Sequence, residues 1–416
     1  MGLTMKNLFE KHRCDENNPI WKQCLQRKEA LYDRNNDIRS EFERDYTRIL
    51  HCEAFRRLKH KTQVFFAPKN DHVCTRMEHV IQVSSVATTM AKYLGLNEQL
   101  VSAIAIGHDL GHAPFGHFGE VCLNSLLSQK EGKNAPKKFW HERNSLFFVD
   151  YIETLQDPKG YSKNLDLTYG VRDGIICHCG EVDETGLFPR KEAIDLYDIK
   201  KAGSVQPFTW EGCVVKLADK IAYLGRDIED ALQYHILDMG AYRQLREIVA
   251  SCFGFKTGKV VNTTVLINDL IVDLCESSSP EKGLCFSPEN YKFITEIKKF
   301  NYGNIYNHWR LLEFQNYAFN VIRTIFETLK RVYPFVSKQK ISFALKRFPL
   351  LSDVFENWLI KYTEYDEEKK QFQKYAEISK VFNLSTEEAY CKCIIEFISG
   401  MTDQFAVSVF EEIISF

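Results

Sequence analysis

The sequence lacks the long apolar stretches of a membrane protein. No run approaches the roughly 18 consecutive apolar residues of a spanning helix, and the first residues, MGLTMKNLFEKHRCDE, contain no apolar signal-peptide region. It also lacks a charge excess, because 54 basic and 56 acidic residues are interspersed and give a formal net charge of -2. The protein as a whole therefore has no positive electrostatic field that would attract a nucleic-acid backbone or an anionic membrane. We expect a cytosolic protein with no membrane partner and no charge-based support for nucleic-acid binding.

The cysteine pattern lacks the spacing of a disulfide scaffold or a zinc knuckle. The 13 cysteines are odd in number and scattered along the chain, as expected where cysteine is a small, reduced, buried residue. The C-x-C pairs Cys177/Cys179 and Cys391/Cys393 differ from the C-x2-C spacing of zinc knuckles. We interpret both pairs as structural.

Helical patterns dominate what is present, and they predict an all-α fold. Apolar residues make up 44% and charged residues 26% of 416 residues, which is typical of a globular protein. Strand-like alternation is scarce and no solenoid repeat is found. Residues 1–50 are highly charged and predict solvated helices. Their thin apolar stripe consists of Leu31, Ile38, Phe42, Tyr46 and Ile49.

Three helices matter for the site. The first covers about residues 77–94 and ends at Gly95 as a C-terminal cap. The second begins near Asn97 and is apolar almost all round (LVSAIAIGHDL), which predicts burial. The third runs from about Gly212 to Leu237. Polar segments with Gly, Pro or Ser predict loops at 128–140, 156–168 and 277–288.

Polar residues beside these apolar helices indicate a metal site. The buried helix ends in His108-Asp109, and an imidazole beside a carboxylate is costly to bury unless both are paired or bind a cation. His79 lies on the inner face of the preceding helix, and Asp219 follows the apolar run CVVKLA. Either alone is as readily a hydrogen-bonded core residue or a helix cap. Together with His108-Asp109 they form a ligand set suited to Zn, Mn or Fe, and also acceptable to Mg.

The segment GHAPFGHFGE follows the His-Asp pair and presents His112, His117 and Glu120. Since imidazole exchanges a proton near neutral pH, we interpret His117 as a general acid or as the group that positions water. Glu120 lies three residues later and is placed to orient it. For His112, a spare ligand or a loop hydrogen bond is an equally good interpretation.

Asp219, Tyr223 and Asp227 share one helical face at i, i+4 and i+8. At 1.5 Å rise per residue this line is roughly 12 Å long, comparable to the distance from a nucleotide's phosphates to the far side of its sugar. An ordinary polar stripe is the alternative for Asp227. Basic residues nearby suit a phosphate site, although each could be a surface charge: they are Arg76 on the face of His79, Lys220, and His141 in FWHERNS.

These motifs resemble the dGTP triphosphohydrolase-like branch of the HD superfamily almost end to end. The matching segments, in family order, are RDYTRILHCEAFRRLKHKTQV, TRMEHVIQV, GHDLGHAPFGHFGE, CHCGE, KLADKIAYLGRDIED, IKKFNYGNIYNHW and EFISGMTDQFA. The segments GHDLGHAPFGHFGE and ADKIAY are specific to this family, and KTQV and GMTD favour its triphosphohydrolase branch. The sequence departs from the pattern at Glu142, where the family usually has Asn, and residues 335–385 carry no assignable motif.

The resemblance implies a role for each matched residue. The metal ligands are His79, His108, Asp109 and Asp219, and the catalytic pair is His117 with Glu120. The phosphates are held by Arg76, His112, His141 and Lys220. The deoxyribose and its 3′-hydroxyl are met by Gln63, Tyr223 and Asp227.

The resemblance also implies the reaction and the architecture. The family hydrolyses deoxynucleoside triphosphates to deoxynucleoside and inorganic triphosphate by attack at the α-phosphorus, with a divalent metal such as Mn, Mg, Fe or Zn. It implies a homo-oligomer and allows an activating allosteric nucleotide. We expect an N-terminal helical segment at 1–50, an HD-type catalytic core at 51–240 and a C-terminal helical region packed on it at 241–416. The expected all-α fold allows for one short β-hairpin.

Two other functions compete with this interpretation. Another HD phosphohydrolase, such as a nucleotidase or a cyclic-nucleotide phosphodiesterase, would share the metal ligands but not KTQV, Tyr223 and GMTD. A regulatory protein that binds nucleotide or single-stranded nucleic acid would not need a complete ligand set with both His117 and Glu120.

Overall fold

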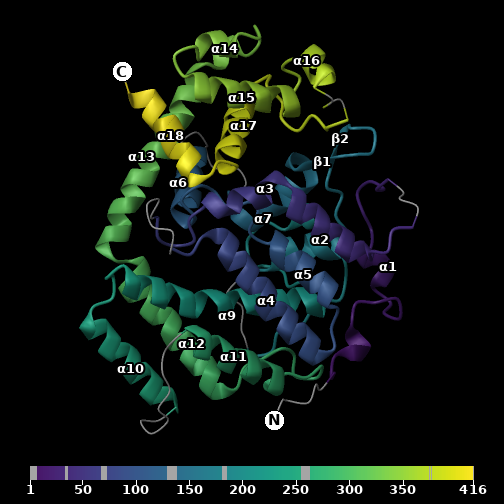
Figure 1. The fold of residues 1–416 in the computed structure, drawn as a ribbon, viewed down its shortest axis with the longest axis vertical. Coiled ribbons are helices and arrows are strands. Elements are labelled where there is room, and N and C mark those ends of the chain that lie inside the picture. Colours follow the sequence, from purple (N-terminus) through teal and green to yellow (C-terminus); the bar gives the residue numbers. More distant parts are fainter. Residues whose placement is uncertain are drawn as a thin grey trace.

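The computed structural model describes residues 7–32, 36–66, 73–128, 138–179, 185–253, 263–373, 375 and 377–415. This part of the chain is built from helices with a single two-stranded sheet (Figure 1). The all-α prediction is therefore confirmed, and so is the short hairpin. Its strands β1 (Thr154–Gln156) and β2 (Ser162–Asn164) pair antiparallel, with Thr154 opposite Asn164.

The helices follow one another along the whole chain. Those before residue 240 are α1 (Trp21–Cys24), α2 (Glu41–His51), α3 (Glu53–Arg57), α4 (Arg76–Leu94), α5 (Glu98–Gly107), α6 (His117–Ser128), α7 (His141–Phe147), α8 (Tyr169–Cys177), α9 (Trp210–Gln233) and α10, which begins at Met239 and ends at Phe253. The later ones are α11 (Thr263–Ser277), α12 (Pro288–Asn301), α13 (Trp309–Arg331), α14 (Ile341–Ala344), α15 (Pro349–Tyr362), α16 (Glu367–Phe372), α17 (Glu387–Ser399) and α18 (Asp403–Ile414). Short 3₁₀ segments are η1 (Glu10–His12), η2 (Leu58–His60), η4 (Leu196–Asp198) and η6 (Tyr333–Phe335), and π-helical turns are η3 (Phe148–Ile152) and η5 (Tyr302–Tyr306).

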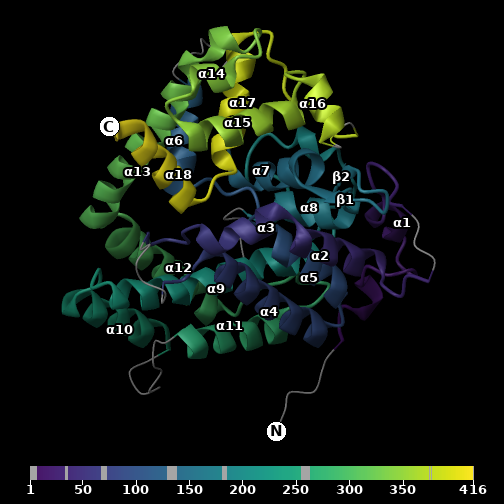
Figure 2. The same cartoon turned by 45° about the horizontal axis from the view of Figure 1, so that its top comes forward.

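The centre of the fold is the buried helix α5. Its apolar residues contact α2, α4, α8 and α9 at once, which explains why it is apolar on every side. α4 packs along α9 as well, so these three helices cross near the middle of the molecule (Figure 2). The polar end of α5 therefore meets the inner faces of α4 and α9.

Local sequence signals set the ends of these helices. Thr75 and Glu78 form a capping box at the start of α4, which satisfies two otherwise unpaired backbone N–H groups. Gly95 ends α4 with a left-handed φ of 84°, a conformation that glycine adopts without steric cost. Asn97 then caps α5 by accepting from the backbone N–H groups of Gln99 and Leu100.

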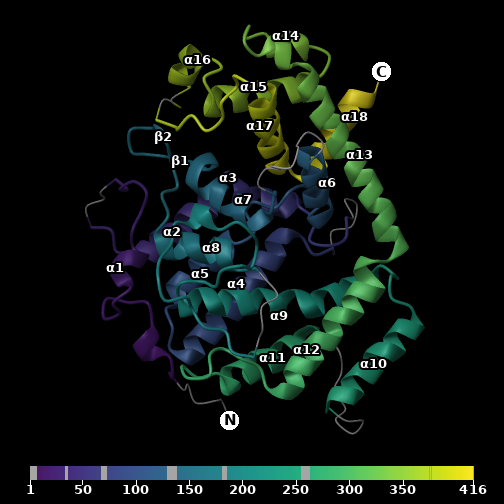
Figure 3. The same cartoon turned by 180° about the vertical axis from the view of Figure 1, so that it is seen from behind.

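Two apolar clusters hold the helices together. The larger one surrounds α4, α5 and α9 and extends to α11 and α12. The second joins α6 to α13, α15, α17 and α18. Helix α13 runs from the neighbourhood of α12 to this second group (Figure 3). The C-terminal helices are thus packed against α6, the helix that follows the turn after α5. The proposed domain boundaries at 50 and 240 stay a prediction.

The prediction of helices over residues 1–50 is partly wrong. Only short turns, η1 and α1, precede residue 41 within the described residues, and Ile38 is 98% exposed instead of lying on an apolar stripe. The helix begins at Glu41 because Ser40 and Glu43 form its capping box. From there the pattern holds, since Phe42 and Ile49 are buried.

The loop predictions also need adjustment. The hairpin occupies part of 156–168. Of the loop expected at 128–140, residues 129–137 lie outside the described residues, as do Gly180 and Glu181 of the CHCGE segment. Across the described helices, none combines the length and apolar character needed to cross a membrane.

Candidate active site

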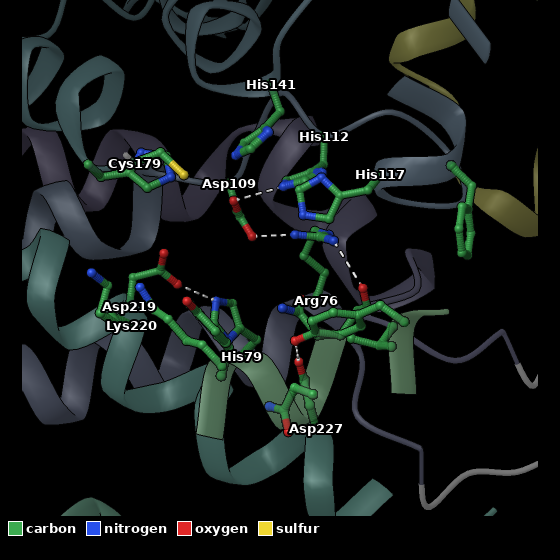
Figure 4. Close-up of a pocket in the computed structure, with 18 of the residues that line it drawn as sticks. Arg76, His79, Asp109, His112, His117, His141, Cys179, Asp219, Lys220 and Asp227 are labelled. Carbon is green, nitrogen blue, oxygen red and sulfur yellow. Dashed lines mark hydrogen bonds and ion pairs between the residues drawn. The ribbon is translucent and has the colours of Figure 1, made fainter. Parts of the chain in front are cut away.

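A cavity of about 420 Å³ opens where α4, α9, the turn after α5, and the N-terminal ends of α6 and α7 meet (Figure 4). This size is typical of sites for small organic ligands. All of the predicted site residues line it except His108 and Glu120. Those two lie behind lining residues, because His108 approaches Asp109 and Asp219, and Glu120 contacts His141.

The four predicted metal ligands lie close together at one side of this cavity, with His108 behind the other three. His79 Nε2 lies 2.9 Å from Asp219 Oδ1. His108 Nε2 lies 3.6 Å from Asp109 Oδ1 and 3.9 Å from Asp219 Oδ1. Donor atoms of His79, His108 and Asp219 all fall within 4.8 Å of one another. The crossing of α4, α5 and α9 therefore brings together side chains that are up to 140 positions apart in the sequence.

The tautomer and protonation state of His108 suit a metal ligand. Its Nδ1 donates to the carbonyl of Ala105 at 2.6 Å, so in the neutral ring Nε2 carries the lone pair. That Nε2 atom is buried and has no hydrogen-bond partner among the described residues. Burial and His178 lower the pKa of His108 to about 4, in spite of the nearby Asp109. A neutral imidazole with an unpartnered, buried lone pair fits a divalent cation.

Asp109 is shared between the metal cluster and the basic side of the pocket. Its Oδ2 accepts from Arg76 Nη1 at 2.5 Å, and its Oδ1 faces His112 Nε2 at 3.2 Å. Burial alone would raise the pKa of Asp109, but His112, His108 and Arg76 outweigh it and hold that pKa well below its usual range. Likewise, the hydrogen bond and charge of His79, together with His108 and His178, overcome burial and lower the pKa of Asp219 to about 2. Both carboxylates are therefore ionised, as metal ligands must be.

Arg76 differs from its predicted role in one respect. We expected its guanidinium to clamp an oxygen of a bound group, and the side chain does line the pocket. It is also held by the protein, through Asp109 and through the carbonyls of Thr62 and Gln63 at 3.3 Å each. Sequence spacing gave the face of the helix but not these partners.

The predicted catalytic pair belongs to a group of stacked histidines. His117 Nδ1 lies 3.9 Å from Glu120 Oε2, which also lies 3.1 Å from His141 Nδ1. The His141 ring stacks on His112 with centroids 3.9 Å apart. The His117 side chain is 75% exposed, unlike its buried neighbours. His117 is thus the member of this group with the freedom to meet a substrate atom.

The part of the cavity beside Asp227 carries side chains that can form hydrogen bonds to a hydroxyl group. Asp219, Tyr223 and Asp227 all line it from α9, as their spacing predicts. Asp227 is buried and accepts a hydrogen bond from the Tyr306 hydroxyl. Gln63 Oε1 is buried without a hydrogen-bond partner among the described residues. An unpartnered acceptor beside the cavity suits a ligand donor such as a hydroxyl.

Comparison with known proteins identifies the family. Residues 76–224 match the HD domain. A deoxyguanosinetriphosphate triphosphohydrolase-like protein of Caldanaerobacter subterraneus is 33% identical over 377 residues, which cover 91% of this chain and 86% of that protein. Proteins of the same description from Rickettsia felis and Clostridium tetani are 30% identical over 91% of the chain and 42% identical over 50% of it.

The chain belongs to the dGTP triphosphohydrolase-like family of HD-domain proteins. HD domains are metal-dependent phosphohydrolases, and the buried His and Asp cluster of this family member fits that chemistry. Family membership therefore establishes the general class of enzyme. The substrate and the individual roles of the site residues belong to the proposal below.

The two segments that favour this branch, KTQV and GMTD, meet beside the site. Asp403 accepts from the backbone N–H groups of Thr62 and Phe115, both at 2.8 Å. The buried Lys61 ammonium donates to the carbonyls of His112 and Ser399. Phe115 itself has a left-handed φ of 64°, which costs energy for a bulky residue. The C-terminal segment thus holds the histidine-bearing turn in its shape.

Several pocket residues of this family member escaped sequence reasoning. Tyr306 comes from the π-helical turn η5, and His178 and Cys179 come from the end of α8. The remaining ones are Val64, Phe115, Phe118, Lys216, Lys298, Asn301, Tyr302 and Leu311. The segments CHCGE and IKKFNYGNIYNHW pointed to two of these regions without giving roles. The structural interpretation of Cys177 holds, because it is buried, whereas Cys179 reaches the pocket.

Proposed function

We propose that this protein hydrolyses deoxynucleoside triphosphates to deoxynucleoside and inorganic triphosphate. One observation carries the proposal: Asp219 of the metal-type cluster and Asp227, which accepts a hydrogen bond from Tyr306 of η5, lie on the same face of α9 and line one cavity. Eight residues of helix separate them by roughly 12 Å. That separation matches the span from the α-phosphate region to the sugar hydroxyls of a nucleotide.

The metal would be held by His79, His108, Asp109 and Asp219. When bound, a divalent cation such as Mn, Mg, Fe or Zn polarises the α-phosphate and acidifies a water molecule. The two carboxylates and the neutral His108 are in the protonation states that such binding requires. Lys220 and Arg76 also line the cavity and would offset the negative charge of the phosphates.

The reaction forms a bond between the water oxygen and the α-phosphorus and breaks the bond between that phosphorus and O5′. O5′ leaves as the alcohol of the deoxynucleoside, so it needs a proton. We assign this proton to His117, because its exposed ring faces the cavity and Glu120 is placed to orient it. His112 and His141, stacked beside it, line the path of the triphosphate.

Sugar recognition would use the opposite end. Asp227 and Gln63 supply acceptors for the 3′-hydroxyl, while Tyr223 and Tyr306 bound the space around the ring. Close packing of these tyrosines against the sugar would leave no room for a 2′-hydroxyl and would select deoxynucleotides. Homo-oligomer formation and an allosteric nucleotide stay predictions of the resemblance.

Replacement of a metal ligand tests the proposal. Asp109→Ala should abolish metal-supported release of triphosphate from deoxynucleoside triphosphates, because it removes a carboxylate of the cluster and the only carboxylate that pairs with Arg76 among the described residues. Asp353→Ala, at an exposed position on α15, is the control and should keep full activity. Ion-exchange chromatography of the products measures both. Full triphosphate release by the Asp109 variant would contradict the assignment.

A further inference from the structure

A second cluster of potential metal ligands adjoins the one described above. His141, Glu142, His178 and Cys179 offer donor atoms that all lie within 4.8 Å of one another. They come from the start of α7 and the end of α8, two helices that pack together. None of the four belongs to the predicted metal set. We propose that they form a second divalent-metal site of the zinc type, next to the first.

The donors are arranged as metal ligands usually are. His178 Nδ1 donates to the carbonyl of Ile175 at 2.7 Å, so in the neutral ring Nε2 carries the lone pair. His108, in the first cluster, is held in the same way by Ala105. The two rings lie edge to face with centroids 4.8 Å apart. Backbone carbonyls of their own helices therefore fix the rings of His108 and His178, and the two Nε2 lone pairs are available to two adjacent metal sites.

Glu142 is the independent observation that points to a cation. Its side chain is 2% exposed, and its Oε2 has no hydrogen-bond partner among the described residues. The closest positively chargeable group is His141, whose Nδ1 lies 3.5 Å from this oxygen. A buried carboxylate oxygen without a hydrogen bond is costly unless a positive charge compensates it.

Protonated His141 is one candidate for this compensation, but its Nδ1 lies closer to Glu120 Oε2, at 3.1 Å, than to Glu142 Oε2. Lys216 is the other candidate, since it also lines the pocket. Its ammonium donates to Gln206 Oε1 at 3.1 Å. No ion pair joins it to Glu142 within the part of the chain that the structure describes. Lys216 therefore does not neutralise the Glu142 carboxylate directly. A cation bound beside Glu142 explains its burial better.

The chemistry of the donor set selects the metal class. One thiolate, one carboxylate and two imidazoles suit zinc, cobalt or ferrous iron, whereas Mg²⁺ prefers oxygen ligands alone. Two anionic donors also match the charge of a divalent cation. Figure 4 shows the Cys179 sulfur turned into the cavity on the side of Asp109. Asp109 with His108 and His178 forms a further ligand group, so the two sites are contiguous.

Cobalt substitution tests the proposal without any measurement of activity. The full-length protein is loaded with Co²⁺, and metal content and absorption spectrum are recorded. We expect two cobalt ions per chain and a sulfur-to-cobalt charge-transfer band in the near ultraviolet. Cys179→Ser should lose the band and one cobalt while keeping the other. Asp219→Ala should do the reverse, losing one cobalt but keeping the band.

Cys252→Ser is the matched control, because Cys252 and Cys179 are the two cysteines that are not fully buried. It should keep both the band and the second cobalt. The proposal is overturned if wild-type protein shows no thiolate band, if Cys179→Ser retains it, or if Cys252→Ser loses it. Circular dichroism verifies that each variant is folded. Because no nucleotide enters the experiment, its outcome is independent of the proposed triphosphohydrolase reaction.

Discussion

The buried carboxyl group of Asp227 makes the fold pH-sensitive. Asp227 is 3% exposed. Burial is the main cause that raises its pKa from 3.8 to about 7, and Asp230 and Asp219 add to it, against the hydrogen bond from Tyr306. The folded protein thus holds this proton more tightly than the unfolded chain does. Ionisation of Asp227 therefore destabilises the fold increasingly between about pH 4 and about pH 7, and fully above that.

The size of the effect follows from the shift. At about 1.4 kcal/mol for each pH unit, a rise from 3.8 to about 7 corresponds to on the order of 4 kcal/mol. Asp227→Asn removes the ionisation and keeps an acceptor for Tyr306. We expect the variant to be more stable than wild type by up to this amount near pH 8, and by almost nothing near pH 4.

Urea unfolding at a series of pH values measures the difference. Asn also weakens the acceptor proposed for the 3′-hydroxyl, so the same variant should lose about 10- to 100-fold in kcat/KM, the equivalent of one hydrogen bond to a charged group. Asp353→Asn, at an exposed position, serves as the control. A stability difference that does not change with pH, or one that grows toward acid, would refute the reasoning.

Two further predictions concern the turn that carries the histidines. Both carboxylate oxygens of Asp403 accept backbone N–H groups, and Asp403→Asn replaces one of these oxygens with an NH₂ donor. We expect the free energy of unfolding, measured in urea, to fall by about 2 kcal/mol, and activity to fall as well. Unchanged stability would contradict the inference that Asp403 holds this turn in its shape. Gly111→Ala places a Cβ 2.1 Å from the Ser145 backbone nitrogen and should strongly lower the melting temperature, whereas Gly303→Ala, which meets nothing within 4 Å, should not. Equal melting temperatures would show that the turn tolerates a side chain there.

The sequence was most informative where polar residues interrupt apolar helices. His108 and Asp109 at the end of an all-apolar helix, and Asp219 after CVVKLA, are conspicuous because burial of such groups is costly. Helical spacing also placed Tyr223 and Asp227 on the face of Asp219, and the structure brings all three to the cavity. Periodicity within one helix was enough for these inferences.

Residues that reach the cavity only through tertiary packing were not predictable in the same way. Tyr306 lies on a π-helical turn 79 positions from its partner Asp227. His178 and Cys179 lie at the end of a helix whose neighbours cannot be read from its own sequence. The partner of Arg76 was missed for the same reason, and helices were expected before Glu41 because charge density alone resembles a solvated helix.

The identity of the reaction products tests the central claim most directly. Purified protein is incubated with each deoxynucleoside and ribonucleoside triphosphate, with Mn²⁺ or Mg²⁺, in ¹⁸O-labelled water, and the products are analysed by chromatography and mass spectrometry. We predict deoxynucleoside and inorganic triphosphate from deoxynucleotides alone, with the label in the triphosphate. Diphosphate or monophosphate products, equal turnover of ribonucleotides, or label in the deoxynucleoside would contradict the proposal.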